Sequence, residues 1–138
     1  MISAVDSTVI LDVVTDDPDF AQGSEGVLRK AAAEGQLVVC ECVLAEVFPA
    51  FGNESSFEEF LTDWQLEFIP SSKESAALAG SHFTRYLERG GRHGRVVADF
   101  LIGGHAGIHA DRLVARDRGY LRDYFSDLVL LDSRVIPH

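Results

Sequence analysis

The stretch ISAVD at residues 2–6 is a short, mainly apolar run that ends at a carboxylate, Asp6. The same pattern returns near the C-terminus, where LVARD at residues 113–117 ends at Asp117. Short apolar runs without polar alternation are typical of central strands in a parallel sheet that helices cover on both faces. The two stretches therefore predict two buried strands, each with an acidic side chain at or just past its carboxyl end.

Similar runs recur along the chain and alternate with segments that carry helix signals. The runs predicted to be strands are residues 2–5, 37–40, 66–69, 113–116 and 128–131. A helix is also predicted over 96–109, where Gly103, Gly104 and Gly107 would allow close packing. Asp17 before Pro18 predicts the N-cap of another helix, which runs to about Glu34. Capping boxes predict two more helix starts, at Ser55 with Glu58 and at Ser71 with Glu74.

Strands that alternate with helices predict right-handed crossovers and a doubly wound α/β sandwich with a central, roughly five-stranded parallel sheet. The 138 residues are expected to form a single domain, residues 1–138, with an ordinary hydrophobic content of 46%. No apolar run approaches the roughly 18 residues that a membrane span needs. The first residues lack the pattern of a signal peptide, so a cytoplasmic protein is expected.

Four acidic residues need a common explanation. Glu46 and Asp99 lie in the otherwise apolar stretches VLAEVF and VVADFLI, where a lone buried carboxylate is unfavourable. Asp6 and Asp117 follow strands, and ligands of open parallel sheets bind beyond the carboxyl ends of strands where the strand order reverses. If the two strands are neighbours there, all four side chains can converge.

An all-oxygen set of carboxylates is suited to Mg²⁺ or Mn²⁺ and not to zinc. The predicted catalytic and metal-binding residues are Asp6, Glu46, Asp99 and Asp117. Bound metal would provide an activated water and offset charge that develops on a phosphodiester. Thr8 could orient the ligand or a metal-bound water, or it could cap the helix after the first strand.

Each acid also has a simpler interpretation. Asp6 and Asp99 could be helix caps, Glu46 could lie on a solvated helix face, and Asp117 could be a turn residue. Asp12 follows Asp6 by six residues and is expected on a helix surface.

The net charge of −10 argues against a broadly cationic, sequence-independent nucleic-acid binder. Ten of the 12 basic residues are nevertheless Arg, whose planar group suits phosphate. They could equally pair with the 22 acidic residues. Most fall in two clusters: Arg85, Arg89, Arg92 and Arg95, and Arg112, Arg116, Arg118 and Arg122. Cys40 and Cys42 are expected to be small buried hydrophobic residues more readily than a metal or redox pair.

Four short motifs, in order, resemble those of the PIN-domain ribonucleases, most closely the VapC toxins of bacterial and archaeal toxin–antitoxin modules. The resemblance spans nearly the whole chain. The motifs are VDSTVIL at residues 5–11, LAEV at residues 44–47, ADFLIGGHA at residues 98–106 and LVARDRGY at residues 113–120.

The resemblance implies a five-stranded parallel sheet and metal-dependent endonucleolytic cleavage of RNA. It also implies an antitoxin partner of the VapB type that blocks the site, and a homodimer of the toxin. One departure is Ala115, which stands where members of the family commonly carry Thr or Ser two residues before the fourth acid. His105 lies within the third motif and is expected to pack in the core.

Two functions remain open on the sequence. The first is a metal-dependent endoribonuclease that acts as a toxin, with Arg92 or Arg95 and Arg116 or Arg118 along the path of the RNA. The second is a PIN-like binding module with weak or lost catalysis, which the loss of a hydroxyl at Ala115 would favour.

Overall fold

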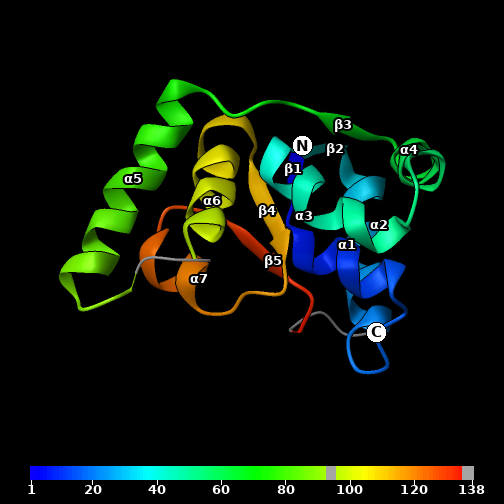
Figure 1. Cartoon of the computed structure of the whole chain (residues 1–138), viewed down its shortest axis with the longest axis horizontal. Helices are drawn as coiled ribbons and strands as arrows, with labels where there is room; N and C mark the ends of the chain where they lie inside the picture. The colour runs from blue at the N-terminus through cyan, green and yellow to red at the C-terminus, as the bar shows by residue number, and fades with distance from the viewer. Residues whose placement is uncertain (93–95, 135–138) are drawn as a thin grey trace.

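A five-stranded, all-parallel sheet forms the centre of the molecule in the computed structural model, which describes residues 1–92 and 96–134 (Figure 1). The strand order is β3-β2-β1-β4-β5. The strands are β1 (Ile2–Val5), β2 (Gln36–Val39), β3 (Leu66–Phe68), β4 (Arg112–Ala115) and β5 (Leu130–Asp132). The predicted fold class and strand number are confirmed, and the predicted bounds are correct to within about two residues.

The strand order reverses on either side of β1. The chain passes from β1 to β2 and β3 on one side and then returns to β4 and β5 on the other. β1 pairs with β4 in register Ala4↔Leu113, and the main-chain N–H of Asp6 donates to the Val114 carbonyl oxygen at 2.9 Å. The first and fourth strands are therefore neighbours at the switch point, as the position of the acids required.

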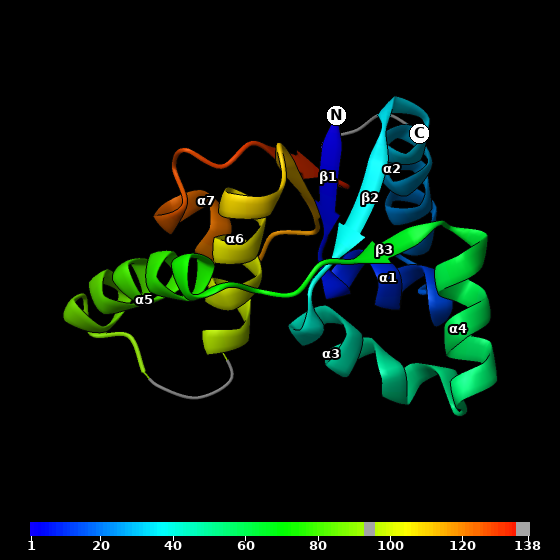
Figure 2. The same ribbon diagram turned by 90° about the horizontal axis from the view of Figure 1, so that it is seen from above.

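Helices cover both faces of the sheet. Figures 1 and 2 show α5, α6 and α7 on one side, and α1 and α2 on the other, with α3 beyond the carboxyl end of β2. The helices are α1 (Ser7–Val14), α2 (Ala21–Glu34), α3 (Glu41–Phe51), α4 (Glu54–Asp63), α5 (Lys73–Glu88), α6 (Val97–His109) and α7 (Tyr120–Tyr124). Among the helices in the described residues, none combines the length and the apolar character that a membrane crossing requires.

The core lies between the sheet and these two helical layers. Every residue of β4 is buried, and Val9, Leu28 and Phe100 from three helices are fully buried against the sheet. Side chains of this kind each stabilise the fold by about 1.5–3 kcal/mol when they leave water. Burial on both faces explains why the strand sequences show no polar alternation.

Three predicted helix starts are wrong by a few residues. Asp17 caps a turn before α2, since its Oδ1 accepts from the main-chain N–H of Asp19 and Phe20. Asn53, not Ser55, caps α4 through a 2.8 Å bond from the Ser56 N–H.

The capping box of α5 is formed by Ser72 and Ser75, not by Ser71 and Glu74. Only the residue with extended backbone at the helix entrance can offer its side chain to the third N–H. Two adjacent serines look equivalent in the sequence for this purpose.

Candidate metal centre

Asp6 follows β1 directly and caps α1. Its Oδ2 accepts hydrogen bonds from the Thr8 hydroxyl and from the Thr8 main-chain N–H, the latter at 3.3 Å. The residue is only 4% exposed. Its Oδ1 accepts no hydrogen bond from the residues that the structure describes. The cap considered from the sequence is therefore present, and it leaves one oxygen of Asp6 for a ligand.

Thr8 connects Asp6 to the neighbouring strand. Its hydroxyl donates to Asp6 Oδ2 and accepts from the main-chain N–H of Arg116 at 3.1 Å, just past the end of β4. Because the hydroxyl both donates and accepts, its orientation is fixed. Thr8 therefore holds the Asp6 carboxylate in place through its side chain.

Asp12 corrects the expectation of a surface residue. It is 3% exposed, and both of its oxygens accept from the Arg116 guanidinium at 2.9 Å. Its Oδ2 also accepts from the Ser24 hydroxyl at 2.7 Å. The residue lies one helical turn after Thr8 on the same face of α1, and this i, i+4 spacing was the available signal for its inward position.

Asp99 lies in the first turn of α6, where the helix dipole favours a negative charge. Its Oδ1 accepts from Arg118 Nη2 at 2.9 Å. The Asp99 side chain is 14% exposed, whereas that of Arg118 is 57% exposed. Oδ2 of Asp99 accepts no hydrogen bond from the described part of the chain, so this acid also keeps an oxygen free.

Asp117 is buried and bonded to the main chain of the segment that follows it. Its Oδ1 accepts from the N–H groups of Gly119 and Leu121, and its Oδ2 accepts from that of Arg122 at 3.0 Å. The turn role that the sequence left as an alternative for Asp117 is therefore present. Three of the four lone-pair positions are occupied, which leaves one on Oδ2 for a metal or a water.

Glu46 projects from α3 toward the start of α1. Its Oε1 accepts from the Ser7 hydroxyl at 3.0 Å, and the residue is exposed. Ser7 is itself buried, so this bond fixes the carboxylate of an otherwise solvated helix position. Glu46 therefore lies beside Asp6 without being enclosed with it.

Asp6, Asp99 and Asp117 line one small pocket, together with Arg116, Arg118 and Tyr120. Glu46 does not line this pocket. No three of the four acids bring carboxylate oxygens within 4.8 Å of one another as a group, although all four belong to the described residues. The structure thus brings three of the acids to one pocket, with the fourth close enough to act on Asp6 electrostatically.

The pocket holds an excess of negative charge. Burial raises the pKa of Asp6 to about 6, and the charges of Asp99 and Glu46 add to this rise, while the Thr8 hydroxyl opposes it. Burial also raises the pKa of Asp99, with Asp117 adding to the rise and Arg118 opposing it. Two acids with raised pKa values in one pocket indicate that a cation would be favoured there.

The donor set fits a hard divalent cation. Asp6 Oδ1 and Asp99 Oδ2 accept no hydrogen bond from the residues that the structure describes. All the ligand atoms that the acids could offer a metal are carboxylate oxygens. Mg²⁺ and Mn²⁺ bind through one or a few carboxylates and keep several waters. The residues present therefore suit such an ion better than they suit zinc or copper.

The arginines predicted to contact RNA differ in exposure and in the partners that their guanidinium groups already have. Arg92 and Arg118 are exposed, whereas the guanidinium of Arg116 is bound to Asp12 and stacks on Phe20 with 4.0 Å to the ring centroid. Arg95 lies outside the described residues. Of the described arginines that line the pocket, Arg118 is the exposed one, and it is paired with Asp99.

His105 packs as the sequence analysis predicted. It is 1% exposed, and its Nε2 lies 2.7 Å from the carbonyl oxygen of Ile69. Because a carbonyl only accepts, Nε2 carries the proton, and burial lowers the pKa of the ring. A neutral, internally bonded His105 has a structural role in this helix.

Comparison with known proteins identifies the fold. No family model matches the sequence, and no curated protein matches it either. A chain of the VapBC2 complex from Rickettsia felis matches the structure with a TM-score of 0.74 and 23% identity, covering 96% of this chain and 98% of that chain. A chain of VapBC-1 from nontypeable Haemophilus influenzae matches with a TM-score of 0.71 and 20% identity, covering 97% of this chain and 99% of that chain.

FitAcB from Neisseria gonorrhoeae also contains a similar chain, with a TM-score of 0.67 and 17% identity. The match covers 99% of this chain and all of the other. At these identities the comparison shows a shared fold over the full length of both chains.

Proposed function

We propose that the chain is a PIN-domain ribonuclease of the VapC type, the toxin of a toxin–antitoxin pair that hydrolyses RNA with Mg²⁺ or Mn²⁺. The observation that carries this proposal is the pocket at the switch point of the sheet, where Asp6, Asp99 and Asp117 meet. The fold shared with chains of toxin–antitoxin complexes and the four sequence motifs support it.

The metal would be held mainly by Asp6 and Asp99, through the oxygens that other groups leave free. Asp117 and Glu46 would add negative charge around the metal. Asp117 has a single lone pair left to offer to the metal or to a metal-bound water. When bound there, a divalent ion supplies an activated water for attack on the phosphodiester and offsets the charge that builds up on it. Thr8 holds Asp6 in position for this role.

RNA would reach the pocket by local positive charge, since the net charge of the chain is −10. Arg118 lies at the pocket and is more than half exposed, so it can leave Asp99 and bind a phosphate. Arg92 and Arg95 precede α6, the helix that carries Asp99. Arg116 would bind RNA less directly, because its guanidinium is held by Asp12 and its main-chain N–H donates to Thr8.

We expect a VapB-like antitoxin partner and a homodimer of the toxin in the cytoplasm. The structural neighbours include VapBC from Salmonella typhimurium, solved with DNA, and a toxin–antitoxin complex from Klebsiella pneumoniae. An antitoxin could insert a basic side chain into the acidic pocket, where Arg118 already neutralises Asp99.

The test is RNA cleavage by the purified chain with Mg²⁺, with Mn²⁺ and with EDTA. Wild type should cut RNA only with metal, while Asp6→Asn and Asp99→Asn should lose about 100-fold or more in rate, since removal of a group that stabilises transition-state charge has effects of this size. Asp63→Asn, at the exposed end of α4, is the matched control and should keep full activity. Equal activity in all four proteins would exclude the acidic pocket as the nuclease site.

A second candidate is a PIN-like module that binds a partner but cleaves RNA weakly or not at all. Its support is specific: Ala115 offers no hydroxyl, and Asp117 is largely occupied by main-chain N–H groups. Wild-type protein that binds an antitoxin but cuts no RNA with any divalent metal would favour this function.

A further inference from the structure

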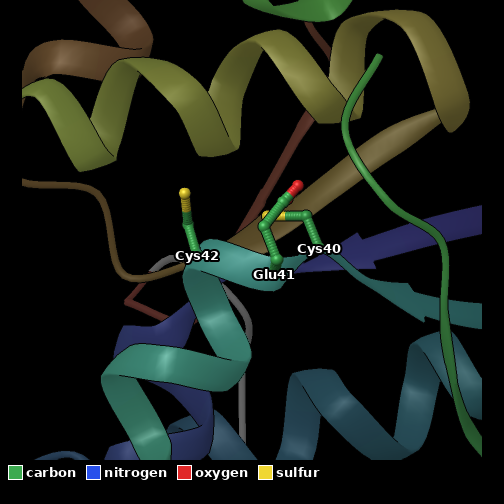
Figure 3. Close-up of side chains that lie close together, drawn as sticks. All are labelled: Cys40, Glu41 and Cys42. Carbon is green, nitrogen blue, oxygen red and sulfur yellow. The ribbon is translucent and has the colours of Figure 1, made fainter.

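Two thiols and a carboxylate meet where β2 leads into α3. The possible ligand atoms of Cys40, Glu41 and Cys42 all lie within 4.8 Å of one another. Figure 3 shows the three side chains projecting from the start of α3 on the side that faces α6. Cys40 is buried, as expected, but Cys42 is only partly buried and so remains accessible.

We propose that Cys40, Glu41 and Cys42 form a second metal site, for a thiophilic divalent cation of the Zn²⁺ type. Two cysteine sulfurs and a carboxylate oxygen are ligands that zinc accepts, whereas Mg²⁺ and Mn²⁺ prefer oxygen alone. The fourth position would be taken by water, as in zinc sites with three protein ligands. The donor chemistry separates this site from the acidic pocket.

The spacing of the ligand atoms suits tetrahedral coordination. With metal–sulfur bonds of about 2.3 Å, two sulfurs on one tetrahedral zinc lie about 3.8 Å apart. Ligand atoms that already lie within 4.8 Å of one another therefore need to approach by about 1 Å at most, which side-chain rotation can provide. No rearrangement of β2 or α3 is required.

The surroundings hold the group in place. Glu41 accepts a 2.7 Å hydrogen bond from the main-chain N–H of Ser71, which ties its carboxylate to the segment before α5. Such an outer contact orients a ligand and strengthens metal binding. Cys40, the N-cap residue of α3, is buried, and burial raises the pKa of its thiol to about 11; a bound divalent cation would displace that proton.

The site lies next to the acidic residues without sharing them. Cys42 and Glu46 are four residues apart on α3 and so occupy the same face of the helix. The proposal stands independently of RNA cleavage, since its ligands are outside the acidic pocket.

The test is a titration of the reduced, metal-free chain with Co²⁺, which reports thiolate coordination through sulfur-to-metal charge-transfer absorption. Wild type should bind one Co²⁺ with this absorption, and Zn²⁺ but not Mg²⁺ should displace it. Cys42→Ser should lose about half of the absorption or more and weaken Zn²⁺ binding by about 100-fold or more, because even outer-shell changes cost 10–100-fold. Since Cys42 is only partly buried, this variant should keep its fold, which circular dichroism checks.

Two further variants complete the test. Glu41→Gln keeps an acceptor for the Ser71 N–H and both thiols, so the absorption should remain while Zn²⁺ affinity falls. Asp6→Asn should bind Co²⁺ with the same absorption as wild type. Wild type without charge-transfer absorption at one equivalent of Co²⁺ would overturn the proposal, as would absorption that is unchanged in Cys42→Ser or that disappears in Asp6→Asn.

Discussion

The guanidinium group of Arg116 binds both carboxylate oxygens of Asp12, with Nε and Nη2 each 2.9 Å from one oxygen. Arg116 lines the acidic pocket and Asp12 lies behind it, so the pair can influence the pocket without contacting a metal. By fixing Arg116, Asp12 also fixes the main-chain N–H that donates to Thr8, whose hydroxyl in turn donates to Asp6. The Asp12–Arg116 salt bridge therefore helps to position Asp6, a proposed metal ligand, through Thr8.

Asp12→Asn should destabilise the fold and slow RNA cleavage together. An amide cannot accept both guanidinium bonds, so the partly buried charge of Arg116 loses about 1.5–3 kcal/mol of interaction. Urea unfolding measures the first effect, and a cleavage assay below the unfolding transition measures the second. Glu25→Gln, which breaks the exposed Glu25–Arg29 pair on α2, is the control and should change stability by less than about 0.5 kcal/mol. Similar small changes in stability and cleavage rate in both variants would mean that the Asp12–Arg116 pair does not position Thr8 and Asp6.

Thr8→Val should reduce activity more than Thr8→Ser. Valine has nearly the shape of threonine but cannot donate to Asp6 or accept from the Arg116 N–H. Loss of this hydroxyl should raise the pKa of Asp6 further, because the Thr8 bond now lowers it. We expect Thr8→Val to lose about 1–3 kcal/mol of stability and Thr8→Ser to stay close to wild type. The check is the rate with Mn²⁺ as a function of pH; equal profiles for the two variants would contradict a positioning role.

The sequence was sufficient for the fold because its signals were local and repeated. Five short buried runs, separated by helix signals, determine a parallel sheet with few alternative connections. Helix starts were less well predicted, as at Ser71 and Ser72, because a cap depends on backbone geometry that adjacent serines do not reveal.

The site was predictable only in part for a similar reason. Asp6, Asp99 and Asp117 could be placed at one end of the sheet, and the structure puts them in one pocket. The spacing from Thr8 indicates the inward face of Asp12, but its partner Arg116 is more than 100 residues away, and no local pattern encodes that pair. The free oxygens of Asp6 and Asp99 likewise depend on which neighbours donate to them.

The contribution of Asp6 to stability without metal should fall as the pH rises through the range between about 4 and about 6. The pKa of Asp6 is raised from 3.8 to about 6 in the folded chain, so the folded state binds more protons than the unfolded state between these values. The contribution of Asp6 is therefore fully present at low pH and is lost above pH 6, by about 3 kcal/mol for two pKa units.

Asp6→Asn isolates this effect, because other groups titrate in both proteins. In EDTA, the variant should gain stability relative to wild type as the pH increases from 4 to 7. Urea unfolding at several pH values measures the difference. A difference that does not change with pH would show that Asp6 titrates normally.

Gly104→Ala should loosen the contact between α5 and α6. A Cβ atom at Gly104 would lie 2.4 Å from the carbonyl oxygen of Ser75, which belongs to the backbone of α5 and cannot rotate away. We expect a loss of about 1–3 kcal/mol in urea unfolding. Gly26→Ala is the matched control on α2, where nothing lies within 4 Å, and it should gain about 0.5–1 kcal/mol from helix propensity. A neutral Gly104→Ala would mean that the two helices can separate at little cost.

Arg118→Glu should weaken RNA cleavage at low salt without unfolding the chain. The side chain is 57% exposed, so its bond to Asp99 adds little stability, and the melting temperature should change by only a few degrees. The reversed charge would repel phosphate and add a further acid to the pocket, so we expect the apparent KM for RNA to rise by about tenfold or more. Arg29→Glu, on the exposed face of α2, carries the same charge change away from the pocket and should cleave at the wild-type rate. A phosphate contact at the pocket would be most sensitive to charge at low salt. If Arg118→Glu cuts RNA as well as Arg29→Glu does under those conditions, RNA reaches the acids by another route.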